Sequence, residues 1–377
     1  MFESPPFWMY AAGLLLLLGP LVTLHELGHY LVGRWFGVEA DAFSVGFGKE
    51  LVGFTDRRGT RWRISALPLG GYVQFRGDMN PASVPDQRAA APPGSFQSAA
   101  LWKRALIVAA GPVTNVLVAI AIFAGFFAVL GNPVPADPEA SQRIGTFAEA
   151  SAARQAGLEL GDKIVAIDNV PINEFRDIQE NVALYPDKTV IIAVERADER
   201  LEYEVTIARV ETDDGFGNKG DIGMIGVGPA ALEYTFEAVP ALELVPLAIE
   251  QCWKLVKMMV TGIQQILTGE RSIKELGGPI KITKVAGERF SLGASAFIEL
   301  VALISLNLAF INFLPIPALD GGHLAFYAVE AIRRKPVGPQ ATEWAYRTGI
   351  AIVLMFMVIV TFNDVFSLPL LGNLFGS

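Results

Sequence analysis

The stretch LVTLHELGHYLVGRWFGV, residues 21–38, decides how the rest of this sequence is interpreted. It contains His25, Glu26 and His29 and follows an uncharged run that begins at Phe7. Because residues four apart share one face of a helix, the two histidines can hold one metal ion through ring nitrogens. The alternative is two histidines that only make hydrogen bonds within a helix bundle. Burying three polar side chains in an apolar helix is costly and normally marks a functional site.

The composition favours a membrane protein. Of 377 residues, 52% are hydrophobic and 18% are charged, whereas soluble domains contain nearer a quarter charged residues. The single cysteine, Cys252, excludes an intramolecular disulfide and a zinc site built from cysteines. Nucleic-acid binding is not indicated.

Four apolar stretches are long enough to cross a bilayer. The first is not a cleaved signal peptide, because its head lacks positive charge and its apolar run is too long, so we expect a retained helix. The predicted spans are Phe7–Phe36, Ala105–Ala136, Leu300–Leu319 and Ala341–Val365.

The charges predict an orientation for these spans. Residues 34–104 hold 10 basic and 6 acidic residues, and residues 333–347 hold 4 basic and 1 acidic. Residues 137–237 hold 21 acidic and 9 basic. Because basic loops mark the cytoplasmic side, we expect both termini outside, with 37–104 and 333–343 inside and 137–290 outside. His25 then lies about 27 Å along its helix at 1.5 Å per residue, near the cytoplasmic boundary.

Three segments between the spans have patterns of their own. Residues 60–75 alternate apolar and polar side chains around a turn at Gly70 and Gly71, which predicts a membrane-associated β-hairpin. Residues 141–230, with GLELGDKIVAIDNVPI at 157–172, resemble a PDZ domain of the protease-associated type; an unspecified small α+β domain is the alternative. Within 237–290, residues 237–268 alternate apolar and charged residues at helical spacing. This predicts an amphipathic segment on the membrane surface, with a fifth span as the alternative.

The predicted fold is therefore a multi-pass α-helical membrane protein with four transmembrane helices, a membrane-associated β-hairpin and an inserted extracytoplasmic α+β PDZ domain. Its predicted divisions are 1–136, 141–230, 237–290 and 291–377.

The chemistry of the site follows from its residue types. Catalytic zinc takes three protein ligands and leaves a position for water. His25 and His29 would supply two, and the third must be His323 or a carboxylate. Asp320, after Pro315 and Pro317 at the end of the third apolar run, is the strongest candidate. Glu26 would stand beside the metal and take a proton from water.

These motifs together resemble the site-2 proteases, a family of intramembrane zinc metalloproteases, in their bacterial sigma-E-protease branch. HELGH matches the family's HExxH motif, and NFLPIPALDG at 312–321 matches its NxxPxPxxDG motif. Four further blocks occur in the family's order: GFGKEL at 46–51, PLGGYV at 68–73, AAGPVTN at 109–115 and GGPIKI at 277–282. One difference is that better-known members of this branch carry two tandem PDZ domains, whereas this chain has room for one.

The resemblance implies a role for each matching residue. His25, His29 and Asp320 would bind Zn²⁺ and Glu26 would be the general base. Asn312, with Asn307 assisting, would bind the substrate backbone or stabilise the oxyanion. The strand at Gly70 and Gly71 would present an edge to an unwound substrate helix, because a helix must be opened before its peptide bonds can be attacked.

The function implied is intramembrane proteolysis of single-span membrane proteins already trimmed outside, such as an anti-sigma factor or a signal-peptide remnant. The enzyme would lie in the bacterial inner membrane among lipids. Its periplasmic PDZ domain would contact a peptide or chain terminus, and its active site would lie near the cytoplasmic side. A catalytically silent PDZ scaffold is the alternative, although the intact base and ligands argue against it. A zinc transporter would need several metal-binding positions along a pathway, and the sequence shows one cluster.

Overall fold

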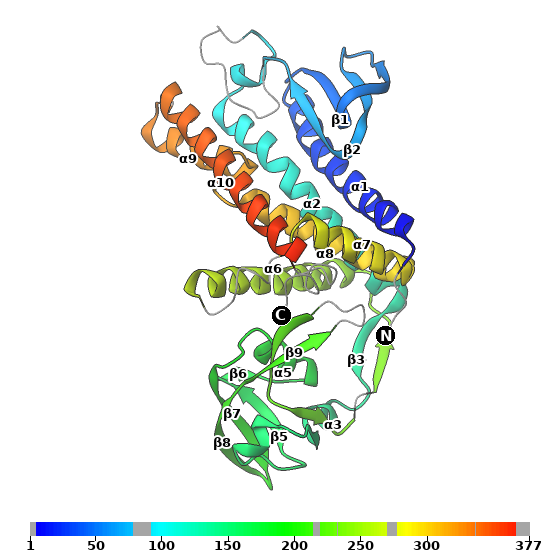
Figure 1. Ribbon diagram of the computed structural model, residues 1–377, viewed down its shortest axis with the longest axis vertical. Coiled ribbons are helices and arrows are strands. Elements are labelled where there is room, and N and C mark those ends of the chain that lie inside the picture. Colours follow the sequence, from blue (N-terminus) through cyan, green and yellow to red (C-terminus); the bar gives the residue numbers. More distant parts are fainter. Residues whose placement is uncertain are drawn as a thin grey trace. The chain divides into compact units, whose positions relative to one another are not determined.

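A computed structural model describes residues 5–77, 92–213, 219–231, 233–269, 277–335 and 337–366. The chain divides into two compact units (Figure 1). A helical unit contains Pro5–Phe123, Ala248–Val256 and Ser272–Ser377, and a β-rich unit contains Ala124–Leu247 and Lys257–Arg271.

Four helices in the described residues are long and apolar enough to cross a membrane, as predicted. The boundaries of two differ from the prediction. The second begins at Leu101, so that Lys103 and Arg104 fall within its first turn, and the third stops at Phe313. The four helices are α1 (Phe7–Trp35), α2 (Leu101–Leu130), α8 (Ala294–Phe313) and α10 (Pro339–Phe366).

The prolines account for the early end of α8. A residue that precedes a proline is pushed out of the helical region, and Leu314, which precedes Pro315, is extended with ψ 140°. Asp320 therefore does not belong to the third span. It is the first residue of a separate helix, α9 (Asp320–Arg333).

The predicted division 237–290 contains two helices, α6 (Leu244–Thr268), which lies within the amphipathic pattern at 237–268, and α7 (Pro279–Ser291). The second packs into the helical unit. A side chain at Gly13 of α1 would collide with the backbone of Ala286, and Gly287 lies against Tyr10. Leu17, Leu21 and Ala286 belong to the same apolar core. The sequence of α7 is amphipathic because one face of this helix packs against α1.

The predicted hairpin is part of a larger two-strand structure, β1 (Ala40–Thr55) with β2 (Arg61–Phe75). Residues 42–45 of β1 have partners on both sides. Ala42 pairs with Gln74 on one side and Arg61 on the other, and Val45 pairs with Gly71 and Ile64. The chain thus reverses within β2, near the predicted turn. The two arms of β2 contact β1, not each other as the hairpin prediction required, because residues 40–45 lie between them.

The β-rich unit is an α+β structure. Its four-stranded antiparallel sheet has the order β6-β5-β7-β8, and α5 (Phe175–Val182) contributes Ile178 and Val182 to the core. The sheet strands are β5 (Lys163–Ile167), β6 (Val170–Pro171), β7 (Thr189–Arg196) and β8 (Glu199–Thr206). Three two-stranded pairs join β3 (Asn132–Pro135) with β12 (Tyr234–Glu237), β4 (Ile144–Phe147) with β11 (Val227–Pro229), and β9 (Ala208–Asp213) with β10 (Lys219–Met224). Short helices α3 (Pro138–Gln142) and α4 (Ala152–Gln155) complete it.

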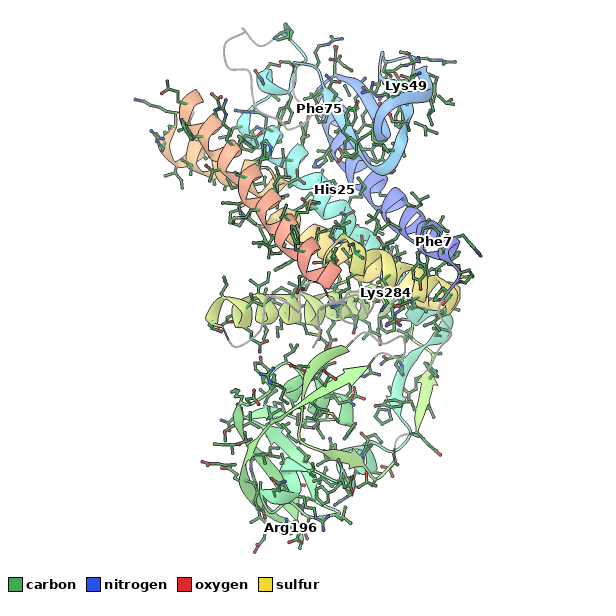
Figure 2. All side chains as sticks on the ribbon, in the orientation of Figure 1. Phe7, His25, Lys49, Phe75, Arg196 and Lys284 are labelled. Atoms are coloured by element: carbon green, nitrogen blue, oxygen red, sulfur yellow. The ribbon has the colours of Figure 1, made fainter. Side chains whose placement is uncertain are left out.

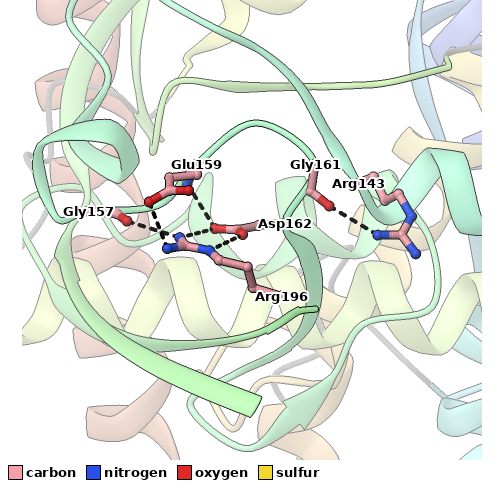
Figure 3. A network of polar contacts seen from close by, with 6 residues as sticks. All are labelled: Arg143, Gly157, Glu159, Gly161, Asp162 and Arg196. Atoms are coloured by element: carbon pink, nitrogen blue, oxygen red, sulfur yellow. Dashed lines mark hydrogen bonds and ion pairs between the residues drawn. The ribbon is translucent and has the colours of Figure 1, made fainter. Parts of the chain in front are cut away.

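A polar network holds the turn that precedes β5 (Figure 3). Arg196 Nε and Nη2 donate to the two carboxylate oxygens of Asp162 at 2.6 and 2.7 Å, and Nη1 donates to Glu159 at 2.8 Å. The Asp162 side chain is 1% exposed. Burial alone would raise the pKa of Asp162, but the hydrogen bonds from Arg196 and from the Glu159 N–H lower it below its usual value. A pattern of apolar residues does not predict this pairing.

Candidate metal centre

Three side chains converge in the helical unit, two from α1 and one from α9 (His25 is labelled in Figure 2). His25 Nε2 lies 3.1 Å from His29 Nε2 and 3.1 Å from Asp320 Oδ2, and His29 Nε2 lies 3.5 Å from the same oxygen. Ligand atoms at 2.0–2.1 Å from a tetrahedral zinc ion stand about 3.3 Å apart. The three atoms therefore have the spacing of a zinc site with room for a fourth ligand.

Asp320 supplies independent support for a cation. Its Oδ2 atom is buried, and apart from His25 Nε2 at 3.1 Å and His29 Nε2 at 3.5 Å no donor of the described residues reaches it. A buried carboxylate oxygen without a donor is costly unless a positive charge faces it. A divalent cation held with His25 and His29 removes that cost, so the donor set fits zinc.

The loop before α9 brings Asp320 to this position. A side chain at Gly321 would lie 2.2 Å from the Leu314 carbonyl oxygen, and one at Gly322 would lie 2.4 Å from that of Ile316. Only glycine lets the loop fold so tightly over the first turn of α9. Ala318 also adopts a left-handed backbone with φ 86°, which is uncommon for a residue other than glycine. The loop is therefore held in a strained form directly before the ligand, a common feature of functional sites.

Helix α2 supports the ligands from the other side. The carbonyl oxygen of Ile107 lies 2.8 Å from His29 Nδ1, so this nitrogen carries the proton and Nε2 keeps its lone pair. The side chain of Asn115 lies 3.1 Å from His25 Nδ1. A Cβ atom at Gly111 would stand 2.3 Å from His29 Nε2, so α2 passes directly beside the centre. The sequence prediction included Gly111 and Asn115 only as part of the block at 109–115 and gave them no role, and it did not include Ile107.

The third histidine does not join the metal group. Tyr346 Oη lies 2.6 Å from His323 Nδ1. Burial lowers the pKa of His323 to about 4, so its ring is neutral and serves as a hydrogen-bond partner of the tyrosine. Of the two possibilities left open for the third ligand, the structure groups Asp320 with His25 and His29.

Glu26 contacts the sheet instead of the ligand group. The Val73 N–H of β2 donates to Glu26 Oε2 at 3.0 Å. A side chain added at Gly71 would lie 3.7 Å from Glu26 Cγ. The arm of β2 that ends at Phe75 therefore lies against the predicted general base.

The remaining predicted site residues lie on β2 and α8. Gly70 has φ 114° and a side chain there would meet Phe47. Asn307 and Asn312 are half-buried residues of α8. Neither is among the hydrogen-bond partners of the three ligands in the described part of the chain, so their roles stay predictions.

Two histidines and an aspartate with zinc spacing, and a glutamate beside them on a helix of membrane length, define a membrane metalloprotease. Residues 13–356 match the family model of Peptidase family M50. The chain belongs to this family, the site-2 proteases.

Relatives agree in length and in their names. The chain is 41% identical over 367 residues to "Putative zinc metalloprotease Atu1380" of Agrobacterium fabrum, an alignment that covers 95% of this chain and 96% of the relative. It is 43% identical over 359 residues to "Putative zinc metalloprotease R01501" of Rhizobium meliloti, covering 93% and 95%. It is 33% identical over 386 residues to "Metalloprotease MmpA" of Caulobacter vibrioides, covering 95% and 96%. The protein is a zinc metalloprotease of the membrane, with Zn²⁺ as its cofactor.

Proposed function

We propose that this metalloprotease hydrolyses peptide bonds within the transmembrane helices of single-span membrane proteins that have already been trimmed outside. The observation that carries the proposal is the position of His25, Glu26 and His29 on α1, a helix apolar enough to cross a membrane. A protease of soluble substrates has no need to place its polar catalytic groups in such a helix, where each is costly to bury.

His25, His29 and Asp320 would hold the zinc ion, and Glu26 would be the catalytic base. When bound, zinc polarises a carbonyl group and lowers the pKa of water. Glu26 takes the proton of the attacking water and passes it to the leaving amine. The Val73 N–H holds one oxygen of this carboxylate, which leaves the other free for the proton.

The β2 strand would present the substrate. A transmembrane helix hides its peptide groups in its own hydrogen bonds, so it must be opened and held extended before cleavage. Addition to a strand edge at Gly70 and Gly71 does this through backbone hydrogen bonds. The contact of the same arm of β2 with Glu26 supports this role. Asn312, with Asn307, would bind the opened backbone or stabilise the oxyanion.

We further propose that the protein belongs to the sigma-E-protease branch of the family and lies in the bacterial inner membrane. Both termini would lie outside the bacterial inner membrane, with the active site near the cytoplasmic side. Residues 141–230 would be a single periplasmic PDZ domain that binds a peptide or chain terminus. The four-stranded antiparallel sheet with α5 beside it supports such a domain. Substrates would be anti-sigma factors or signal-peptide remnants.

Substrate trapping tests the proposal. A Glu26→Gln variant keeps the three ligands and removes the base, so uncut single-span membrane proteins should accumulate with it in native membranes. Glu299→Gln is the matched control, because Glu299 is exposed on α8 and the same change there should leave processing at the wild-type level. Accumulation of soluble proteins alone, or normal processing by Glu26→Gln, would contradict the proposal.

A further inference from the structure

The environment of His25 carries an inference about Asn115, a residue of α2 that is fully buried. Asparagine in the middle of a membrane helix is costly unless its amide has a partner. The structure places Asn115 Nδ2 3.1 Å from His25 Nδ1, and Asn115 Oδ1 is buried without a hydrogen bond in the described part of the protein. The amide therefore faces a metal ligand and not lipid.

His29 shows what such a partner must do. The Ile107 carbonyl can only accept, so His29 Nδ1 must carry the ring proton, and Nε2 is free to bind a metal. His25 also turns its Nε2 atom toward Asp320 Oδ2. A neutral ring that binds through Nε2 must likewise place its proton on Nδ1, so His25 also needs an acceptor at this position.

Only one atom of Asn115 can meet this need. An amide NH₂ opposite Nδ1 would favour the tautomer whose proton sits on Nε2, which cannot bind zinc. The amide nitrogen and oxygen have nearly the same shape, so a half-turn of the group places Oδ1 opposite Nδ1 without any other movement. The oxygen then accepts the proton of His25.

We propose that Asn115 is a positioning residue of the zinc site: its Oδ1 atom accepts the hydrogen bond from His25 Nδ1 and thereby directs Nε2 at the metal. Ser305 of α8 fixes α2 at this point, because its hydroxyl donates to the backbone oxygen of Asn115 at 2.8 Å. Gly111, one turn earlier, lets α2 approach the ligands closely. The two ligands of α1 are thus both oriented from α2, His29 by a backbone carbonyl and His25 by a side-chain amide.

The test measures zinc affinity of the full-length protein in detergent by competition with a chelator. Asn115→Leu keeps the approximate size of the side chain and removes the acceptor, so the affinity should fall about 10- to 100-fold. Asn115→Asp restores an acceptor oxygen and should bind zinc within about threefold of wild type or more tightly. Gly125→Ala is the control on the same helix, because a side chain there would meet no atom within 4 Å, so its affinity should be that of wild type.

A purely structural role gives a different pattern. Wild-type affinity in Asn115→Leu, or equal losses in Asn115→Leu and Asn115→Asp, would overturn the proposal. If Asn115→Leu does not reach the membrane, Asn115→Ala is read in the same way. The inference rests on His25, His29 and Asp320 being the zinc site, and this is checked separately: a His25→Ala variant that still binds zinc like wild type refutes the site itself.

Discussion

Replacing Gly111 by alanine places a methyl group directly against the metal ligands. The Cβ atom would stand 2.3 Å from His29 Nε2 and 2.7 Å from His25 Nε2. Contacts between a carbon atom and a neighbouring heavy atom are favourable only from about 3.5 Å outward. The imidazole rings or α2 must therefore move by about 1 Å.

This displacement is large on the scale of catalysis. A misplacement of about 1 Å can cost about 100-fold in rate. We expect Gly111→Ala to lower the rate of substrate cleavage at least about 100-fold and to weaken zinc binding. The assay follows cleavage of a single-span substrate in proteoliposomes, with bound zinc measured on the same samples by mass spectrometry.

Gly125→Ala is the matched control on the same helix, because a side chain at Gly125 would meet no atom within 4 Å. Alanine in a helix is favoured over glycine by about 1 kcal/mol, so both variants should fold at least as well as wild type by this criterion. Gly125→Ala should cleave like wild type. Wild-type cleavage and zinc content in Gly111→Ala would refute the placement of α2 beside the ligands.

Three further perturbations have expected outcomes. Replacing Val73 by its α-hydroxy acid removes the N–H that donates a hydrogen bond to Glu26. The rate of cleavage should fall about 10-fold with the zinc affinity unchanged. An unaltered rate would show that this hydrogen bond does not position the base. Asp162→Asn should cost about 1.5–3 kcal/mol of local stability at pH 7, seen as faster hydrogen exchange in β5 and β7. Because the folded-state pKa of Asp162 lies below its unfolded value of about 4, the stabilisation is present above about pH 4 and is lost as the pH falls through the lowered pKa. The effect of the substitution should thus disappear in acid, and an effect that is independent of pH contradicts the ion pair. Asp364 accepts from the backbone N–H groups of Gly278, Ile280 and Lys281 at 2.9–3.1 Å, so Asp364→Asn should loosen the start of α7 by about 1–2 kcal/mol. Unchanged hydrogen exchange in α7 would show that the cap contributes nothing.

The sequence predicts the half of the site that depends on local spacing. His25 and His29 are four residues apart, so a helix alone brings them together. Asp320 lies nearly three hundred residues away, and its choice as a ligand rested on its position after an apolar run and on the family motif. The structure brings the three together but assigns Asp320 to α9, because the prolines end α8 at Phe313.

Contacts between segments far apart in the chain could not be predicted from the sequence alone. Nothing in AAGPVTN shows that Asn115 faces His25 or that Ile107 holds His29, since both contacts depend on how α2 packs against α1. The partner of the predicted hairpin was missed for a similar reason. Ala40–Thr55 contains three glycines and a charged pair, so it lacks the regular alternation of a strand. The packing of α7 against α1 was not predicted either, because an amphipathic pattern does not distinguish contact with lipid from contact with another helix.

The position of the cut in the substrate tests intramembrane proteolysis most directly. A single-span substrate trimmed on the outside is incubated with the enzyme in proteoliposomes, and the products are mapped by mass spectrometry. We expect a cut within the transmembrane segment that is absent with Glu26→Gln, although that variant should still bind zinc through His25, His29 and Asp320. Cleavage confined to residues outside the membrane, or the same cut made by Glu26→Gln, would contradict it.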